Sequence, residues 1–410
     1  MKRYALCLVL ALIFLEWLDF SLYLYLAKTV FSARFFPASS LSLVLSFALF
    51  AAGYFARPVG GWLFGRRADR LGRRKPMVSS AALMGLATLG ICLLPEYNKI
   101  GLWATWSLLL LRIMQGLALG GEINTSAMFL VEHHPEKPLF AGSFSAAAGA
   151  LGMFIGGAAA AILHSINQPE LWRIIFAVVG AASLLVCRLR KKLSESPEFQ
   201  QQTHSPQKIE WLRYKWNFLN IAAVGIYVSV TVYMCNVFWV SFAIDQRLMA
   251  KELCSWSGSL AQLGASLLAL AIARLAKPEQ ACRLLHSSMI TAALTAPLLF
   301  YFTYQHNLAG VFCALAGYVL ANGLLCSALF YFLYLQLPVQ IRCQGVSTTW
   351  SLAASIGALA LPLAAQGTAS GYLWVPGCIV SLVAVCALIL CRESRGKETY
   401  YLLRRKSFVE

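Results

Sequence analysis

The stretch GRRADRLGRRK, Gly65 to Lys75, is a short, strongly charged loop between two long apolar runs. The run before it covers residues 40–64, and the run after it covers residues 76–95. A membrane-spanning helix needs about 20 mainly apolar residues, because the hydrocarbon core of a bilayer is about 30 Å thick. Each run is therefore long enough to cross a membrane, with the charged loop at the membrane surface.

The composition of the whole chain also indicates a membrane protein. Of its 410 residues, 59% are hydrophobic and only 12% are charged, whereas a soluble domain has about 25% charged residues. Because backbone groups cannot stay unpaired in lipid, we expect helices to form the spans. The 12 cysteines contain no Cys-x-x-Cys pair, so we expect small buried hydrophobic side chains rather than a metal site or a disulfide framework.

Twelve apolar segments can be read along the chain. The first resembles a signal peptide at its start, but its apolar run continues past Glu16, so we expect it to remain as a span. The predicted spans are residues 5–31, 40–64, 76–95, 101–131, 138–164, 171–190, 214–241, 253–275, 283–304, 307–335, 343–366 and 371–391.

The positions of Lys and Arg predict the orientation. Of the 34 such residues, 26 lie on the side of the N-terminus, six on the other side, and Arg57 and Arg112 within spans. Cytoplasmic loops are enriched in these residues, so both termini are predicted to be cytoplasmic. This distribution also explains the formal charge of +17 without a nucleic-acid partner.

The longest polar break in the middle of the chain separates six spans from six. We predict an N-terminal six-helix bundle over 1–192, a cytoplasmic linker over 193–212, a C-terminal six-helix bundle over 213–391 and a cytoplasmic tail over 392–410. Two six-span halves are typical of a large class of transporters, which bind their substrate between the halves.

Several stretches resemble one protein family. The loop at 65–75 matches the G-x-x-x-D-R-x-G-R-R signature of the major facilitator superfamily, in the loop where that family carries it. The stretches EWLDFSLYLYLA, ARPVGGWLFGRRADRLGRRK and RIMQGLALGGEINTSAMFLVEHHP resemble spans of its metabolite:proton symporter branch, which includes proline/betaine and α-ketoglutarate carriers. The resemblance implies an all-α integral membrane protein with twelve transmembrane helices in two six-helix bundles, the major facilitator fold. It is thinner in the second half, where the counterpart loop ARLAKPEQACR has lost the signature.

Two acids lie inside the first span. Glu16 and Asp19 are three residues apart, so they share one helix face, which Tyr23 continues. A charge at this depth costs roughly 2.5–3.5 kcal/mol, and a carboxyl group lowers that cost by taking up a proton. We therefore predict that Glu16 and Asp19 carry a coupling proton, the alternative being an acid that only fixes helix packing. Glu122 is a further proton candidate, or a packing acid that meets the basic loop.

Arg112 lies near the middle of the fourth predicted span. It cannot lose its proton, and its two-pronged head suits a carboxylate, although a permanent structural salt bridge is the alternative. Because we see only one cation at this depth, a zwitterion or monocarboxylate is favoured over a dicarboxylate, with aromatic faces receiving an ammonium group. The residues predicted to bind the substrate are Arg112, Gln115, Tyr23, Tyr233, Asn236 and Trp239.

The charged loop itself lies too close to the surface to be a substrate site. The resemblance implies that Asp69, Arg70, Arg73 and Arg74 form a latch between the halves, which breaks when the carrier faces inward. We expect Arg57, at the inner end of the second span, to join this latch.

Together these features predict a proton-coupled importer of an amino-acid-like or betaine-like zwitterion or a carboxylate. It would act as a monomer in a bacterial-type cytoplasmic (inner) membrane, with the proton as coupling ion and no metal or other cofactor. The alternatives are an exporter, disfavoured by Met153 where exporters often have Pro, an importer of a polycarboxylate such as a citrate-type siderophore, and a sensor derived from a carrier. An enzyme is not expected, since no nucleophile–base set is visible and the six histidines show no ligand spacing within a span.

Overall fold

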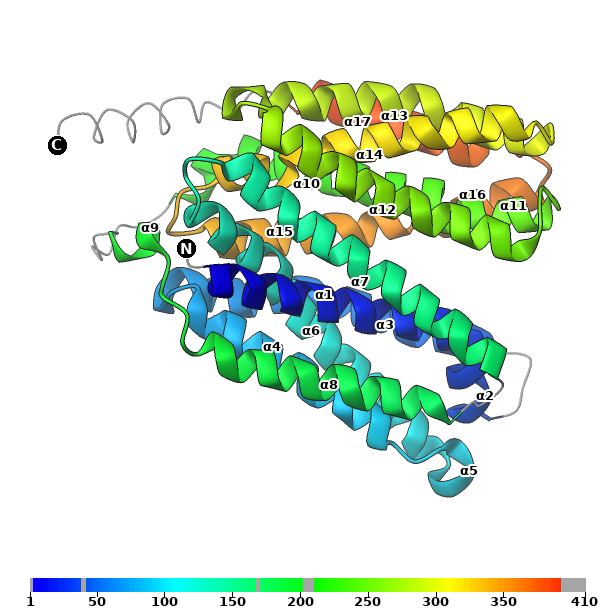
Figure 1. The fold of residues 1–410 in the computed structure, drawn as a ribbon, viewed down its shortest axis with the longest axis horizontal. Helices are drawn as coiled ribbons and strands as arrows, with labels where there is room; N and C mark the ends of the chain where they lie inside the picture. Colours follow the sequence, from blue (N-terminus) through cyan, green and yellow to red (C-terminus); the bar gives the residue numbers. More distant parts are fainter. Residues whose placement is uncertain (1–2, 38–41, 167–169, 202–209, 392–410) are drawn as a thin grey trace.

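The computed structural model describes residues 3–37, 42–166, 170–201 and 210–391. The predicted tail at 392–410 and residues 202–209 of the predicted linker lie outside the described residues. The described part contains helices and no β-strand, and its long helices lie roughly along one common axis (Figure 1). This arrangement satisfies the backbone hydrogen bonds inside each helix, as a lipid environment requires.

The first half of the chain forms six long helical segments, the first of which continues through a short π-helix, η1. Such a π-helical turn is unusual and often occurs at a functional site. The elements are α1 (Arg3–Leu26), η1 (Ala27–Phe31), α2 (Ser32–Arg34), α3 (Ser42–Leu71), α4 (Arg74–Leu93), α5 (Tyr97–Ile100), α6 (Leu102–Glu132), α7 (Pro138–Ile166), α8 (Leu171–Arg190) and α9 (Pro197–Gln200).

The second half also forms six segments, and its first segment contains a second π-helix, η3. The elements are η2 (Trp211–Tyr214), α10 (Lys215–Val232), η3 (Tyr233–Phe238), α11 (Trp239–Asp245), α12 (Lys251–Leu275), η4 (Pro278–Gln280), α13 (Ala281–Tyr304), α14 (Leu308–Gln336), α15 (Arg342–Ala358), α16 (Ala360–Ala369) and α17 (Val375–Leu390).

Among the described residues, ten helical segments are long and apolar enough to cross a membrane. The 30-residue helix α3 and the shorter apolar helix α17 complete the twelve segments. The all-α, twelve-helix membrane architecture predicted from the apolar runs is therefore confirmed.

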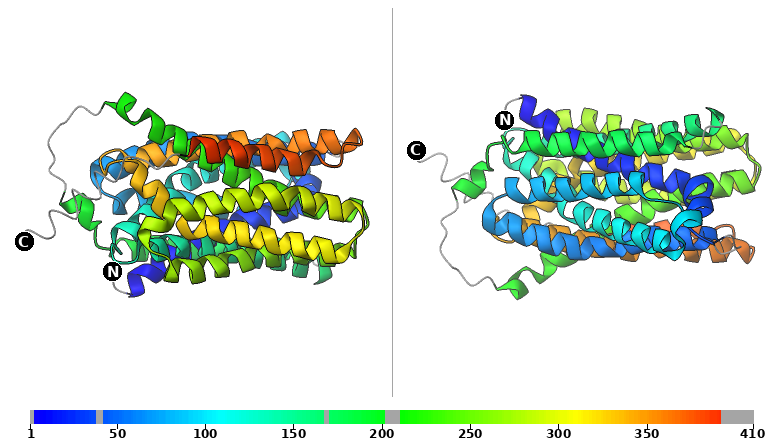
Figure 2. Two further views of the ribbon diagram at one scale, coloured as in Figure 1. Left: turned by 90° about the horizontal axis from the view of Figure 1, so that it is seen from above. Right: turned by 90° about the horizontal axis from the view of Figure 1, so that it is seen from below.

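The helices of each half pack mainly with one another. In the first half, α1 packs on α7, α3 on α6, and α4 on α8; in the second half, α13 packs on α14 and α17, and α10 on α15. Helix α3 also packs on α15, and α7 on α12 and α14, which joins the halves. Figure 2 shows the same side-by-side packing of the helices from above and below.

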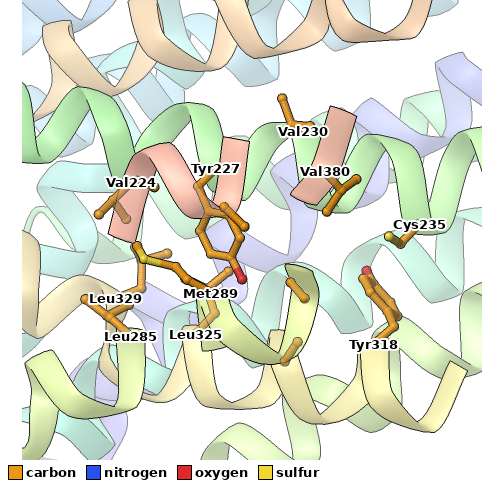
Figure 3. Packing of buried hydrophobic residues seen from close by; sticks show 14 of the residues in the cluster. Val224, Tyr227, Val230, Cys235, Leu285, Met289, Tyr318, Leu325, Leu329 and Val380 are labelled. Atoms are coloured by element: carbon orange, nitrogen blue, oxygen red, sulfur yellow. The ribbon is translucent and has the colours of Figure 1, made fainter. Parts of the chain in front are cut away.

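The core of the second half is apolar with a few neutral hydrogen bonds. Figure 3 shows Tyr227 among Met289, Leu325 and Leu329. The Tyr227 hydroxyl lies 2.8 Å from Ser288 Oγ, which donates to the Ala321 carbonyl at 2.7 Å. Buried acids, by contrast, occur in the first half, so the charged chemistry concentrates there.

Several basic loops lie at one end of the bundle, which we call the basic end. It is formed by residues 66–75, Lys137, residues 188–192 and Arg342, close to the start of α1. The opposite end carries α5, the short α2 and the start of α8 (Figure 1).

Candidate functional site

A small pocket lies inside the first half of the molecule. It encloses about 10 Å³, roughly the room that one water molecule needs. This conformation is therefore closed around the pocket. Helices α1, α3, α4 and α6 supply its lining, which consists of Asp19, Phe20, Gly53, Tyr54, Arg57, Met84, Arg112, Gln115, Gly116 and Leu119.

A chain of hydrogen bonds joins the acid and one arginine of this pocket. Arg112 Nη1 donates to Gln115 Oε1 at 2.6 Å, and Gln115 Nε2 donates to Asp19 Oδ2 at 2.7 Å. Thr88 Oγ1 donates to the other carboxylate oxygen of Asp19 at 3.2 Å. The Gln115 amide therefore links the carboxylate to the guanidinium, so a change of charge at Asp19 alters the hydrogen bonding of Arg112.

Aromatic rings hold both guanidinium groups of the pocket. The Arg112 Cζ atom lies 4.0 Å from the centre of the Tyr23 ring. Arg57 Cζ lies 3.7 Å from the Tyr54 ring centre and 4.9 Å from that of Phe20. Such stacking stabilises a cation without neutralising it, so both groups keep their positive charge toward the pocket.

Glycines allow α3 and α6 to approach closely beside the pocket. A Cβ atom added at Gly116 would lie 1.9 Å from the Gly53 carbonyl oxygen, and one at Gly120 would lie 2.0 Å from that of Arg57. Real side-chain atoms do not tolerate such distances, so the close contact of the two helices requires glycine at both positions.

A second charged cluster joins the two halves at the basic end. Asp69 Oδ1 accepts from the Cys343 backbone N–H at 3.0 Å, and Oδ2 accepts from that of Gln344 at 2.8 Å. Both donors belong to the first turn of α15, whose N–H groups have no partner inside the helix and carry a partial positive charge. Asp69 thus caps a helix of the other half.

Arginines and glutamates surround this cap. Arg73 donates to Asp69 at 3.0 Å and to Glu132 at 3.1 Å. Arg342, from the second half, donates to Glu132 at 2.8 Å and to Glu198 at 2.8 Å. We call Asp69, Arg73, Glu132, Glu198 and Arg342 the basic-end network.

Comparisons with known proteins identify the family of this chain. The family described as "Sugar (and other) transporter" matches residues 5–210. The chain belongs to this family of the major facilitator superfamily. It is therefore a multi-pass membrane transporter of small molecules.

Curated relatives of this transporter cover almost its whole length. It is 29% identical to the alpha-ketoglutarate permease of Escherichia coli, over 93% of the chain and 92% of that protein. It is 26% identical to the citrate-proton symporter of Klebsiella pneumoniae, over 96% of the chain and 90% of that protein. Membership in the metabolite:proton symporter branch, inferred above from motifs, is therefore confirmed.

Solved structures show the same fold. A proton:xylose symporter of Escherichia coli superposes with a TM-score of 0.72 at 17% identity, covering 96% of each chain. The fucose:proton symporter of the same organism gives 0.71 at 14% identity, covering 95% of this chain and 98% of that one. At these identities the likeness concerns the fold alone.

The other two predicted proton carriers of the transporter have different surroundings. Glu16 is fully buried, and within the described residues neither of its carboxylate oxygens has a hydrogen-bond partner. Glu122 is also fully buried, but it forms an ion pair with Arg190 and accepts from Ser80 at 2.6 Å and from Ser126 at 2.5 Å. Glu122 therefore meets a cation of α8 rather than the charged loop at 65–75.

The predicted residues of the second half are divided between two environments. Tyr233 lies in η3, and its hydroxyl contacts that of Tyr54 across the two halves, with ring centres 6.2 Å apart. Asn236 instead donates to the Gly258 carbonyl at 3.0 Å, and the buried Trp239 donates to Thr303 at 2.9 Å. Asn236 and Trp239 thus face the packing of their own half in this conformation.

The predicted latch residues also separate. Arg70 is exposed, and Arg74 donates to the Leu193 carbonyl at 3.1 Å, within the first half. Arg57 lies twelve residues before Asp69, about 18 Å along α3, and lines the central pocket. In this conformation its side chain stacks on Phe20 and Tyr54, and its membership in the latch stays a prediction.

Sequence reasoning missed several members of the basic-end network. Glu132, Glu198 and Arg342 come from three separate segments that only the fold brings together. The signals were present but weak, since Glu132 ends a long apolar segment and Glu198 lies in the polar stretch LSESPEF.

The opposite end carries a partly exposed ion-pair cluster. Arg34 Nη1 lies 2.5 Å from Glu96 Oε1 and 2.6 Å from Glu170 Oε1, and Arg173 Nη2 lies 3.4 Å from Glu96 Oε1. Partial burial opposes ionisation of Glu96, but the hydrogen bonds and charges of Arg34 and Arg173 outweigh it and hold the pKa of Glu96 below its ordinary value. This cluster ties the end of the first span to α8.

Proposed function

We propose that this transporter is a proton-coupled symporter that imports a small organic anion across a bacterial-type cytoplasmic membrane, with both termini in the cytoplasm and the monomer as the working unit. The observation that supports this most is the buried chain of Asp19, Gln115 and Arg112 at the central pocket. A proton acceptor and a carboxylate-binding group there share one amide, so each responds to the other.

The coupling step follows from the cost of buried charge. While Asp19 is ionised, its negative charge attracts Arg112 through Gln115. A proton on Asp19 removes that charge and leaves the Arg112 guanidinium to a substrate carboxylate, which it can bind with two parallel hydrogen bonds. Proton and anion therefore favour each other's binding, which is the linkage that a symporter needs.

The two further acids take different roles in this proposal. The Glu122–Arg190 pair is already neutral as a pair, so we assign it to holding α6 and α8 together rather than to proton movement. Glu16 has no such cation bonded to it, and a fully buried unpaired charge is costly. We therefore propose that Glu16 carries a proton in this conformation and is a secondary proton site behind Asp19.

The basic-end network supplies the alternating access. Asp69 and Arg73 of the first half contact α15 and Arg342 of the second half at the proposed cytoplasmic end. While these contacts hold, the halves cannot separate there, and the site is reached only from the other side. Loading of proton and anion would let the halves rock and break the contacts.

A solute with an ammonium group is disfavoured, contrary to the expectation from the sequence. That expectation assumed a single cation at the site, whereas Arg57 and Arg112 both line the pocket. Two guanidinium groups repel an ammonium and attract anions. Two of the relatives are named as carriers of organic anions, an alpha-ketoglutarate permease and a citrate-proton symporter.

The test is uptake into liposomes that contain the purified protein, with an acidic exterior. Carboxylates of one to three acid groups, shikimate, proline and glycine betaine are screened as radiolabelled solutes. We expect accumulation of an organic anion that a protonophore abolishes and that Asp19→Asn and Arg112→Gln both remove. Expulsion of a preloaded solute under the same gradient would overturn import and favour the exporter, while accumulation without any gradient would overturn coupling.

A further inference from the structure

Arg57 differs from three other buried arginines of the transporter. Its exposed fraction is 7%, yet within the described residues it forms no ion pair with a carboxylate. Three other buried arginines all contact a glutamate or aspartate directly, namely Arg73, Arg190 and Arg342. A buried charge held only by aromatic rings is expensive unless an anion compensates it, so Arg57 is suited to a ligand.

The helix packing places Arg57 near Arg112. A Cβ atom at Gly53 would lie 2.9 Å from the Arg112 carbonyl oxygen, and Gly120 abuts the Arg57 backbone. Arg57 follows Gly53 by four residues, about one turn or 6 Å along the helix. These contacts place the Arg57 backbone one to two turns, roughly 6–12 Å, further along the bundle than the Arg112 backbone. Both arginines line the same pocket.

We propose that Arg57 and Arg112 are two anchors of one anion site, so that the transported solute carries two anionic groups and moves together with a proton on Asp19. This inference rests on the proposed symport and adds the charge class of the solute. It also assigns to Arg57 a role in specificity that the latch expectation did not contain.

Charge balance explains why the second anionic group and the proton belong together. Two guanidinium groups and a protonated Asp19 carry a charge of +2, which a dianion neutralises. A monoanion reaches neutrality only when Asp19 stays ionised, and it then brings no proton. Because uncompensated charge in a low-dielectric pocket is costly, the dianion is the solute that requires protonation of Asp19.

The groups that face Asp19 support this count. Helix α6 presents Arg112, α3 presents Arg57, and α4 presents the neutral Thr88 hydroxyl. On α1 itself, Glu16 is one turn away and lies in the field of the Glu122–Arg190 pair as well as of Arg57. If Glu16 carries a proton, as proposed because its buried carboxyl group has no cation bonded to it, Asp19 is the carboxyl group that balances the positive charge of the pocket.

The second anchor also lies where the two halves meet. Arg57 stacks on Tyr54, whose hydroxyl contacts that of Tyr233 in the second half. An anionic group on Arg57 would therefore arrive beside this inter-half contact. In this proposal, a solute held at both anchors lies next to the contact between the halves.

The experiment compares two probes of equal chain length, glutarate with two carboxylates and pentanoate with one. Succinate, adipate and citrate extend the series. Binding to the purified protein is measured by calorimetry between pH 5 and pH 8, and proton uptake is recorded in weakly buffered solution. We expect a dicarboxylate of the series to bind at least 10-fold more tightly than pentanoate, with about one proton taken up for each dicarboxylate and none for each pentanoate.

Substitutions separate the two anchors. Arg57→Gln is expected to weaken dicarboxylate binding at least 10-fold and leave pentanoate binding unchanged, whereas Arg112→Gln weakens both. Arg57→Lys keeps the charge and should recover part of the dicarboxylate affinity. Arg66→Gln is the matched control, because Arg66 lies on the same helix and also stacks on an aromatic ring, that of Trp62 at 5.6 Å, outside the pocket.

Each outcome bears on the inference. The inference is overturned if glutarate and pentanoate bind equally well, or if no di- or tricarboxylate binds. It is also overturned if a folded Arg57→Gln protein loses the same affinity for both probes. Proton-driven uptake of a monocarboxylate that is unchanged in Arg57→Gln would overturn the two-anchor inference while leaving the proposed symport intact. Two-anchor binding without any gradient-driven uptake would instead support the anion site and contradict symport.

Discussion

The central pocket and the basic-end network are both buried charge clusters, but they are balanced differently. In the basic-end network, Arg73 and Arg342 contact Glu132 directly, and Asp69 also receives two backbone N–H groups. In the pocket, the Gln115 amide joins Asp19 to Arg112, and Arg57 stacks on rings. A saturated cluster stabilises one conformation, whereas an unsaturated one has capacity left for a ligand and a proton.

The largest expected effect tests the unsaturated cluster. In Asp19→Asn the amide cannot gain a proton, so gradient-driven uptake should fall more than 100-fold while exchange of solute across the membrane continues. Asp245→Asn, an exposed acid at the end of α11, is the matched control and should transport normally. Retention of gradient-driven accumulation in Asp19→Asn would place the proton elsewhere, with Glu16 as the next candidate.

The second effect concerns the saturated cluster. Glu132→Gln leaves Arg73 and Arg342 without their shared carboxylate, and removing one partner of a buried ion pair costs about 3–5 kcal/mol. We expect a clear drop in the thermal unfolding midpoint in detergent. Glu136→Gln, four residues after Glu132 and exposed, should leave the midpoint unchanged, and an equal midpoint in both variants would show that Glu132 is not structurally important.

The third effect tests the network as a latch. Asp69→Asn weakens the cap on α15, so Cys343, which is fully buried beside it, should become more accessible to a membrane-permeant maleimide. We expect about a 10-fold faster modification of Cys343, about 1.4 kcal/mol toward the open state, measured by peptide mass spectrometry. The buried Cys235 of η3 serves as the internal control, and parallel acceleration at both cysteines would indicate general unfolding instead.

The smallest effect concerns the partly exposed ion-pair cluster at the opposite end. Because ion pairs hold the pKa of Glu96 below its ordinary value of 4.5, its contribution to stability is present above pH 4.5 and disappears as the pH falls through the lowered pKa. Exposed pairs contribute at most about 1 kcal/mol. Glu96→Gln should therefore lower the unfolding midpoint slightly at pH 7, with the difference from the unsubstituted protein shrinking in acid. A difference that grows in acid would contradict this assignment.

Much of the fold followed from the sequence, because each span needs only local information. A run of about 20 apolar residues predicts a helix in lipid wherever it occurs. The structure differs from these predictions where α3 continues past residue 64 to Leu71, and where a segment is irregular, as at the π-helix η3 and at the division of the eleventh segment into α15 and α16. These depend on contacts with neighbouring helices, which the apolar pattern does not encode.

The candidate site could be predicted from the sequence only in part. Glu16, Asp19 and Arg112 stand out because charge inside a span is costly, and the structure brings Asp19 and Arg112 into one pocket through Gln115. The partner of Glu122 was not visible, since Arg190 lies 68 residues away along the chain. The place of Arg57 at the central pocket was not visible either, because its depth within a 30-residue helix depends on how α3 packs against α6.

The sequence by itself determined that this chain crosses a membrane many times, which way it is expected to face, and that a few charges inside the spans are its functional candidates. Those properties depend on composition and on the position of each residue along its own helix. Only the tertiary structure decided which charges meet, because pairing depends on helix rotation and on close contacts at Gly53, Gly116 and Gly120. It thereby separated a balanced network that joins the two halves from a pocket with two arginines.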